Sequence, residues 1–318
     1  MIECPIDDLD IIFISYDEPM KEAHWLQLVA QNPFVKRVDG VTGFDAAHKQ
    51  AATLAETDRF ITIDGDTTVN PEFFNMTLRY DDQKYGNHVF SWAGTNSVNG
   101  LVYGNGSIKC WPRETALTMR THENAPDDRG RIEFCWSIPY LSMKDSYSTT
   151  HPAPTPYHGF RAGMREGVKM ALDGGGVLDP DQIFKRIWVG NANRLLSWCS
   201  IGSDHENGLW AIYGARMGLH LMTTKTWDMN NISDYEWFKS FWTTLIDDMP
   251  LGRNSRVCKH SGLSWNPEWV IEQIGKLGDD IHRKTGVFVP LFDPEQSRLH
   301  KMLSQYVAPS TEQVLFKE

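Results

Sequence analysis

Residues 58–74, DRFITIDGDTTVNPEFF, decide the fold class of this chain. Residues 60–63 (FITI) form a short apolar run rich in β-branched and aromatic side chains, which is typical of a buried central strand. The run leads directly into Asp64-Gly65-Asp66. Gly65 leaves the turn without a side chain, so that a ligand can approach its backbone. The stretch therefore predicts a strand that ends in an acidic turn.

Two carboxylates one residue apart repel each other and lose hydration when they are buried, so a strand end that carries them commonly holds a cation. Just beyond the turn, Asn70 and Pro71 predict the N-cap and the first residue of a helix. Together these signals predict a divalent metal at Asp64 and Asp66, at the carboxyl end of an α/β sheet. A surface turn without a ligand is the alternative.

A buried strand that ends in Asp-x-Asp resembles the metal and nucleotide-sugar motif of glycosyltransferases with the GT-A fold. Residues 43–54 (GFDAAHKQAATL) are similar to the helix that precedes this motif in family 2 glycosyltransferases. The segments YDEP, AHKQAA, YGNGSIKCWP and FRAGMREGVKM resemble GT-A-type transferases encoded by tailed bacteriophages. The resemblance implies an α/β fold with a mixed central sheet flanked by helices in residues 1–246. A basic loop and a helical C-terminal extension would follow in residues 247–318.

Composition sets wider limits. The chain has 318 residues and a net charge of −10. Residues 1–100 carry 7 Lys and Arg against 16 Asp and Glu, a net −9, whereas residues 101–200 carry 12 against 10, a net +2. A polyanion would therefore meet the middle of the chain rather than its first third. Five scattered cysteines without CxxC spacing favour a reducing compartment. With no membrane-length apolar run and no signal peptide, we expect a cytoplasmic protein, in the host cytoplasm if a phage encodes it.

The first predicted strand, residues 11–15 (IIFIS), ends in another acidic turn. In the GT-A pattern this strand end meets the nucleoside. The resemblance therefore implies that Ser15, Asp17 and Glu18 bind the base or the ribose. A plain acidic turn before the helix expected at residues 20–30 is the alternative.

Three basic side chains are further candidates for the donor site. The resemblance places His48 and Lys49, on the helix before the acidic turn, against the nucleotide, where Lys49 would neutralise diphosphate charge together with the metal at Asp64. A solvated helix charge is the alternative for Lys49. Residues 104–106 (GNG) lack the context of a phosphate loop and predict a turn that presents Lys109 to the donor sugar.

Residues 195–201 (LLSWCSI) predict another buried strand, followed by a polar turn and a helix. Ser203 and Glu206 fit a capping box, which is the structural interpretation. In inverting GT-A enzymes a catalytic carboxylate stands at the start of a helix in this part of the chain, where the helix dipole keeps it ionised. The resemblance thus makes Asp204 the expected catalytic base and Glu206 the second choice.

Basic residues in the second half are candidates for acceptor binding. On the helix predicted at residues 160–172, one edge carries a cation every four residues: Arg161, Arg165 and Lys169. The Gly/Ser-rich segment 252–264 carries Arg253, Arg256 and Lys259, and its His260 is a candidate metal ligand. Solvated charges are the alternative in both places. Residues 146–157 (SYSTTHPAPTPY) predict a surface connection.

The expected reaction is transfer of a sugar from a nucleotide diphosphate donor, a UDP-sugar, to a hydroxyl group, with Mn²⁺ or Mg²⁺ as cofactor. The phage-like resemblance implies double-stranded DNA that contains 5-hydroxymethylcytosine as the acceptor. A protein, lipid or polysaccharide acceptor is the alternative. A sugar nucleotidyltransferase shares the sheet and the acidic turn, but it normally has a Gly-rich basic loop where this chain has YDEP.

Overall fold

The computed structural model describes residues 1–103, 107–224 and 226–306. Within these ranges the chain forms two compact units, the first made of residues 1–96 and 102–151 and the second of residues 97–101 and 152–306. The boundary expected at residue 246 lies inside the second unit. The turn expected at residues 104–106 lies outside the described residues.

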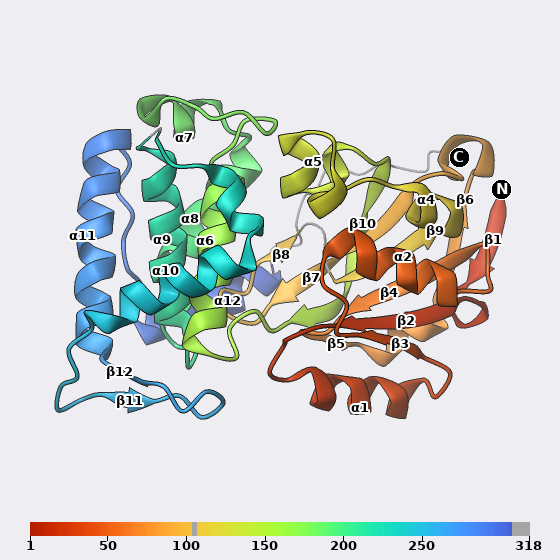
Figure 1. The fold of residues 1–318 in the computed structure, drawn as a ribbon, viewed down its shortest axis with the longest axis horizontal. Coiled ribbons are helices and arrows are strands. Elements are labelled where there is room, and N and C mark those ends of the chain that lie inside the picture. Colours follow the sequence, from red (N-terminus) through yellow and green to blue (C-terminus); the bar gives the residue numbers. More distant parts are fainter. Residues whose placement is uncertain (104–106, 225, 307–318) are drawn as a thin grey trace. The chain divides into compact units, whose positions relative to one another are not determined.

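The first unit is built on a mixed sheet with the strand order β3-β2-β4-β9-β7-β10-β5, and β8 pairs with β7 (Figure 1). Its strands are β2 (Asp10–Ser15), β3 (Lys36–Asp39), β4 (Arg59–Asp64), β5 (Thr67–Val69), β7 (Val89–Asn96), β8 (Val102–Tyr103), β9 (Ile108–Pro112) and β10 (Tyr140–Thr150). β2, β3 and β4 run parallel, whereas β9 is antiparallel to β4 and β7. A separate ribbon pairs β1 (Ile2–Pro5) with β6 (Thr77–Tyr80).

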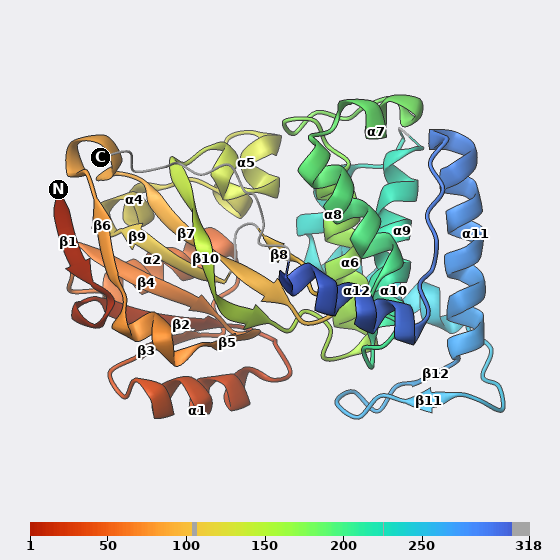
Figure 2. The same cartoon turned by 180° about the vertical axis from the view of Figure 1, so that it is seen from behind.

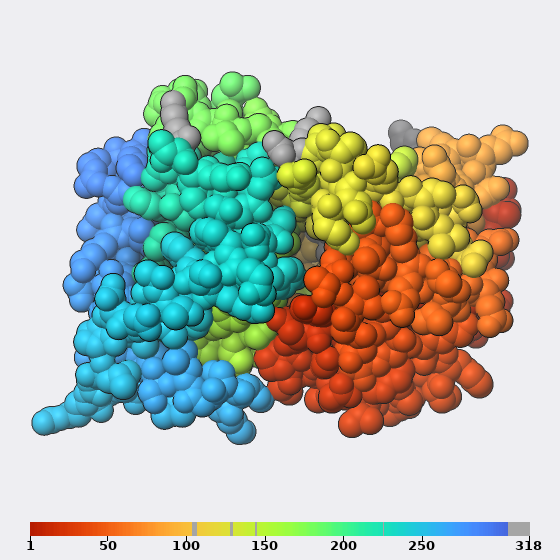
Figure 3. All heavy atoms as spheres, viewed as in Figure 1, coloured from red at the N-terminus to blue at the C-terminus, as the bar shows by residue number. Residues whose placement is uncertain are grey.

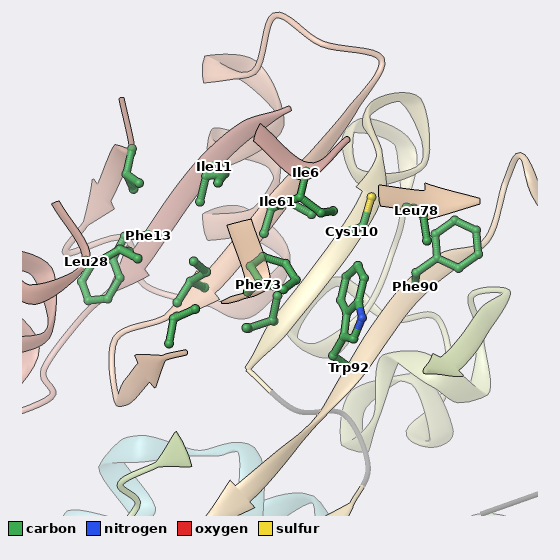
Figure 4. Packing of buried hydrophobic residues seen from close by; sticks show 14 of the residues in the cluster. Ile6, Ile11, Phe13, Leu28, Ile61, Phe73, Leu78, Phe90, Trp92 and Cys110 are labelled. Carbon is green, nitrogen blue, oxygen red and sulfur yellow. The ribbon is translucent and has the colours of Figure 1, made fainter. Parts of the chain in front are cut away.

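Helices cover both faces of this sheet, because alternate residues of each strand point to opposite faces. On one face, Ile61 of β4 belongs to one cluster of buried residues that also contains Leu28 of α1 (Lys21–Gln31) and Phe73 of η2 (Pro71–Asn75), as Figure 4 shows. On the other face, Phe60 packs with Ala51 of α2 (Phe44–Leu54) and with Trp111. The short helices α3 (Asp82–Tyr85), α4 (Arg113–Thr118) and α5 (Asp128–Ile132) complete the unit. The predicted α/β class with a mixed, helix-flanked sheet is confirmed.

One prediction in this unit is wrong. Residues 146–150 are not part of a surface connection; they are the last five of the eleven residues of β10, which pairs with β7 on one side and β5 on the other. Tyr147, Thr149 and Thr150 have the β-propensity that the strand needs, and Ser148 is buried. The prediction gave too much weight to the prolines, which begin only at Pro152.

The second unit is predominantly helical (Figure 2). Its helices are α6 (Pro156–Met170), α7 (Ile183–Arg186), α8 (Val189–Ser200), α9 (Gly208–Met222), α10 (Tyr235–Asp247), α11 (Pro267–Thr285) and α12 (Pro294–Tyr306), and it also contains a hairpin of β11 (Arg256–Val257) and β12 (Ser264–Trp265). The predicted helical C-terminal region is confirmed. Among the helices that the structure describes, none combines the length and the apolarity needed to cross a membrane.

Glycines let α6 and α9 approach each other at backbone distance. A Cβ on Gly163 would overlap the carbonyl oxygen of Ala211, and a Cβ on Gly214 would overlap that of Phe160. Next to this crossing, the buried guanidinium of Arg216 donates hydrogen bonds of 2.8–2.9 Å to the carbonyl oxygens of Cys199, Ile274, Val289 and Pro290. Arg216 therefore ties α8, α9, α11 and the segment before α12 together.

Two predictions in the second unit are also wrong. Residues 195–201 form the end of α8 rather than a strand; Leu195, Trp198 and Cys199 are buried at helical spacing, and a short apolar run does not separate helix from strand. The capping box of Ser203 and Glu206 is absent as well. The N-cap of α9 is Asn207, which makes no side-chain capping bond, and Ser203 instead donates its hydroxyl proton to the carbonyl oxygen of Phe292 (2.6 Å).

Candidate active site

The carboxyl ends of three parallel strands, β2, β3 and β4, lie at the same edge of the sheet in the first unit. In the sheet register Ser15 of β2 lies opposite Asp39 of β3, and Ile14 of β2 lies opposite Asp64 of β4. Open α/β sheets bind their ligands outside the carboxyl ends of such strands. Polar groups at these three ends are therefore the first candidates for ligand binding.

The acidic turn that follows β4 brings the carboxylate of Asp66 close to the like charge of Asp64. Asp64 is 38% exposed, and its Oδ2 lies 3.4 Å from the Nζ of Lys109, a side chain of β9 that is itself buried. Asp66 is half-buried and accepts a hydrogen bond from the hydroxyl of Thr67 (3.2 Å). Burial and the negative charge of Asp64 raise the pKa of Asp66 to about 6. A cation at this turn would relieve that repulsion.

The backbone of the turn is fixed by three other segments of the first unit. The amide of Asp64 donates to the carbonyl oxygen of Ser107 (3.2 Å), and the amide of His151 donates to that of Asp66 (2.8 Å). Between them, the Nδ1 of His24 in α1 lies 2.9 Å from the carbonyl oxygen of Gly65. The turn is therefore held at every one of its three residues.

Glu18 lies against this turn, which its position in the sequence did not indicate. A Cβ added to Gly65 would lie 2.7 Å from Oε2 of Glu18. The same oxygen accepts a hydrogen bond from the amide of Tyr16 (2.7 Å). Burial, together with the charges of Asp66 and Asp17, raises the pKa of Glu18. A third acidic group thus adjoins the two that the sequence identified.

Sequence reasoning missed Asp39. Its Oδ1 accepts hydrogen bonds from the hydroxyl of Ser15 (2.7 Å) and from the Nζ of Lys21 (2.7 Å). The signal was available, since Asp39 ends the short strand KRVD in the same way as Asp64 ends β4. Asp17, the other nucleoside candidate of this region, is exposed.

The basic candidates of the first unit are all engaged within the fold. His48 is buried and its Nδ1 lies 2.8 Å from the carbonyl oxygen of Phe44; burial and the charge of Lys109 lower its pKa to about 3. Lys49 forms an ion pair with the fully buried Asp45 (2.7 Å). Lys109 is the one that reaches the acidic turn.

The two expected catalytic carboxylates belong to the second unit. Asp204 is nearly buried, and its Oδ2 lies 2.5 Å from the Nζ of Lys301 in α12. Its Oδ1 is buried and has no hydrogen-bond partner among the described residues. Glu206 is exposed in the turn before α9. Asp204 is therefore held by an ion pair through Oδ2, and Oδ1 takes no part in that pair.

The three cations expected on one edge of α6 turn inward. Arg161 lies over the ring of Tyr235 (4.7 Å from the guanidinium carbon to the ring centroid), and Arg165 donates to the carbonyl oxygen of Ile232 (2.9 Å). Lys169 pairs with Glu166 (3.2 Å).

The second group of basic candidates lies at the surface. Arg253, Arg256, Lys259 and His260 are exposed, on or beside the hairpin of β11 and β12. Figure 3 shows this segment, in light blue, standing out from the surface of the second unit.

The resemblance implies a divalent metal, and the donor set at the turn fits one. Among the described residues, no group of three or more His, Cys, Asp or Glu side chains is arranged to hold a metal ion alone. Asp64 and Asp66 supply two carboxylates, and Mg²⁺ in nucleotide enzymes is commonly held by one or two carboxylates, substrate phosphates and water. The turn thus fits a metal whose coordination is completed by a diphosphate.

Comparisons with known proteins add little. No protein-family model matches the chain, and no curated protein matches it. One solved structure to which it is similar is that of a glycosyltransferase involved in the glycosylation of the major capsid of PBCV-1. The identity is 12% and the TM-score 0.29, over 44% of this chain and 92% of that chain. With so low a TM-score, this similarity carries no conclusion about function.

Proposed function

We propose that this chain is a metal-dependent glycosyltransferase, which moves a sugar from a nucleotide diphosphate donor, a UDP-sugar, to a hydroxyl acceptor. The observation that carries the proposal is the acidic turn at the carboxyl end of β4, where the charge of Asp64 and burial raise the pKa of Asp66 to about 6. Such a turn favours a cation, and the parallel-strand edge beside it is the usual place for a nucleotide.

In this proposal Asp64 and Asp66 hold Mn²⁺ or Mg²⁺. The ion, when bound, offsets the charge that develops on the leaving diphosphate. Lys109 contributes a fixed positive charge 3.4 Å from Asp64, and its burial makes that charge more effective than an exposed one. Asp39, at the end of β3, offers a partly exposed carboxylate to the nucleoside, and the buried hydroxyl of Ser15 at the end of β2 donates to that carboxylate (2.7 Å).

Asp204 is the proposed base for the acceptor proton. Its Oδ2 forms an ion pair with the Nζ of Lys301 (2.5 Å). One carboxylate oxygen, Oδ1, is not used by the ion pair. This oxygen is buried, so it would take the proton from the acceptor hydroxyl only once it becomes accessible to the acceptor.

For the acceptor we propose 5-hydroxymethylcytosine in double-stranded DNA, whose primary hydroxyl suits this chemistry. The enzyme would reach it through the major groove or by flipping the base out of the stack. The exposed cations Arg253, Arg256 and Lys259 favour a phosphate backbone near the β11–β12 hairpin. The inward-turned Arg161, Arg165 and Lys169 give this acceptor less support than the sequence suggested.

A thermal-shift series tests the donor site. We expect UDP and UDP-sugars to raise the melting temperature only with Mn²⁺ present, because a ligand that binds the folded state stabilises it by mass action. Asp66→Ala should abolish the shift. The exposed carboxylate of Glu114, on α4 of the same unit, provides the matched control Glu114→Ala, which should keep it. Equal shifts in EDTA, or an unchanged shift in Asp66→Ala, would refute the metal site.

A transfer assay tests the acceptor. The enzyme is incubated with a labelled nucleotide sugar and duplexes that contain cytosine or hydroxymethylcytosine. Label in the hydroxymethylated duplex alone, decreasing as salt rises and after Arg256→Glu, supports DNA. Absence of label across several donors would reject DNA and leave a protein, lipid or polysaccharide acceptor to be tested.

A further inference from the structure

The acidic turn does not fix its own backbone. Gly65 at its centre cannot carry a side chain, since a Cβ there would come within 3.0 Å of both Glu18 and Ser15. Glycine, however, is the residue with the widest choice of backbone conformations. The orientation of the Asp64 and Asp66 side chains therefore depends on what holds the peptide groups between them.

Three hydrogen bonds hold the turn, and two of them join backbone atoms at its two ends, the amide of Asp64 and the carbonyl oxygen of Asp66. The third is made by a side chain, with the Nδ1 of His24 lying 2.9 Å from the carbonyl oxygen of Gly65. A carbonyl oxygen only accepts, so Nδ1 must carry the proton. Of the three bonds, only this one can be removed by a substitution without altering the backbone.

The imidazole of His24 is itself held in place. His24 is only 7% exposed on α1, and its ring lies 5.2 Å from that of His151, centroid to centroid. The Nε2 of His151 in turn lies 3.0 Å from the hydroxyl of Thr68. A ring restrained on its other side can direct Nδ1 at one atom, which is what positioning requires.

We propose that His24 is a positioning residue of the metal site, whose Nδ1–H bond to Gly65 fixes the turn so that Asp64 and Asp66 reach one ion together. This inference rests on the proposed function, because it assumes that the turn binds a metal. Groups that orient metal ligands in this way typically contribute 10–100-fold to metal affinity.

Three variants separate the hydrogen bond from packing. His24→Phe keeps a ring but removes the donor. His24→Asn removes the ring but keeps a donor nitrogen the same number of bonds from Cα as Nδ1. Gln31→Leu is the matched control: Gln31 also lies on α1 and donates from its Nε2 to the backbone oxygen of Val69 in β5 (3.2 Å), outside the three residues of the turn.

The first measurement is Mn²⁺ affinity in the presence of UDP. The electron paramagnetic resonance signal of free Mn²⁺ reports how much of the ion is unbound. We expect His24→Phe to bind about 10–100-fold more weakly than wild type, His24→Asn to recover most of the loss, and Gln31→Leu to match wild type. Wild-type affinity in His24→Phe, or equal losses in the Phe and Asn variants, would overturn the inference.

The second measurement is hydrogen exchange of peptides covering residues 58–66 in metal-free protein. His24→Phe should accelerate exchange there, whereas His24→Asn and Gln31→Leu should not. Unchanged exchange in His24→Phe overturns the positioning role. If wild type and Asp66→Ala bind Mn²⁺ equally poorly, the proposed function fails, and the exchange data still decide whether His24 fixes the turn.

Discussion

The acidic groups of the two units are in opposite situations. In the first unit, Asp66 meets the like charge of Asp64 and receives one hydrogen bond from a neighbouring hydroxyl. In the second unit, Asp204 is nearly buried but lies 2.5 Å from the ammonium of Lys301. The first arrangement raises a pKa to about 6, whereas the second pairs each charge with its opposite.

This difference supports the proposal that the acidic turn binds a cation. A folded protein keeps unfavourable electrostatics chiefly at functional sites, where a ligand relieves them. The acidic turn has that property. Asp204 does not have this property, because it forms an ion pair with Lys301. Its proposed role in catalysis therefore depends on Oδ1 and not on electrostatic repulsion. The predictions below test this contrast.

The largest effect is expected at Asp204. Asp204→Asn removes the basicity and keeps the size, so we expect the rate per folded molecule to fall about 10²–10⁴-fold with donor affinity nearly unchanged. Steady-state kinetics and UDP binding measure the two quantities. Glu206→Gln, which changes the exposed carboxylate two residues away, is the matched control.

If Asp204→Asn lowers the free energy of unfolding while the rate per folded molecule persists, Asp204 is only a partner of Lys301. If Glu206→Gln is inactive and Asp204→Asn is active, the base is Glu206.

The next effect concerns stability in the second unit. Arg216→Leu leaves four buried carbonyl oxygens without their donor, so we expect the free energy of unfolding to fall by about 3 kcal/mol. Urea denaturation measures it. Mn²⁺-dependent UDP binding by the folded variant should remain, since the metal site belongs to the first unit. A loss below about 0.5 kcal/mol, the size of ordinary surface substitutions, would contradict the account of Arg216.

The smallest effect is a pH dependence of the metal-free protein. The pKa of Asp66 rises from 3.8 to about 6 on folding, so the folded state binds the proton more tightly than the unfolded state. Stability from this group is present below pH 4 and is lost as the pH rises through 6. Asp66→Asn should therefore melt at a higher temperature than wild type at pH 7–8 in EDTA. The difference in melting temperature between Asp66→Asn and wild type should shrink toward pH 4. A difference that stays constant from pH 4 to 8 would contradict the electrostatic account.

The sequence predicted the first unit well because its signals are local. Continuous apolar strands, a small-residue helix and an acidic turn lie within residues 11–66, and neighbouring residues specify each of them. The carboxyl ends of β2 and β4 were predictable for the same reason. Asp39 ends β3 in the same way, but β3 has only four residues, KRVD, and its apolar signal is weak.

What the sequence did not show depends on residues far apart in the chain. The contact of His24 with Gly65 spans 41 residues, and the pairing of Asp204 with Lys301 spans nearly a hundred. Neither contact is signalled by a pattern of neighbouring residues. The close packing of α6 on α9 is signalled by such a pattern, because Gly159, Gly163 and Gly167 recur every four residues and favour close helix contact.

The central claim is that the turn of Asp64 and Asp66 joins a divalent metal to a nucleotide diphosphate. Isothermal titration of UDP into wild type, with Mn²⁺ and with EDTA, and into Asp66→Ala with Mn²⁺ tests it most directly. We predict saturable binding to wild type with Mn²⁺, and affinity lower by several kcal/mol, about 10³-fold, in the other two titrations. Equal UDP affinity in all three titrations would contradict the claim.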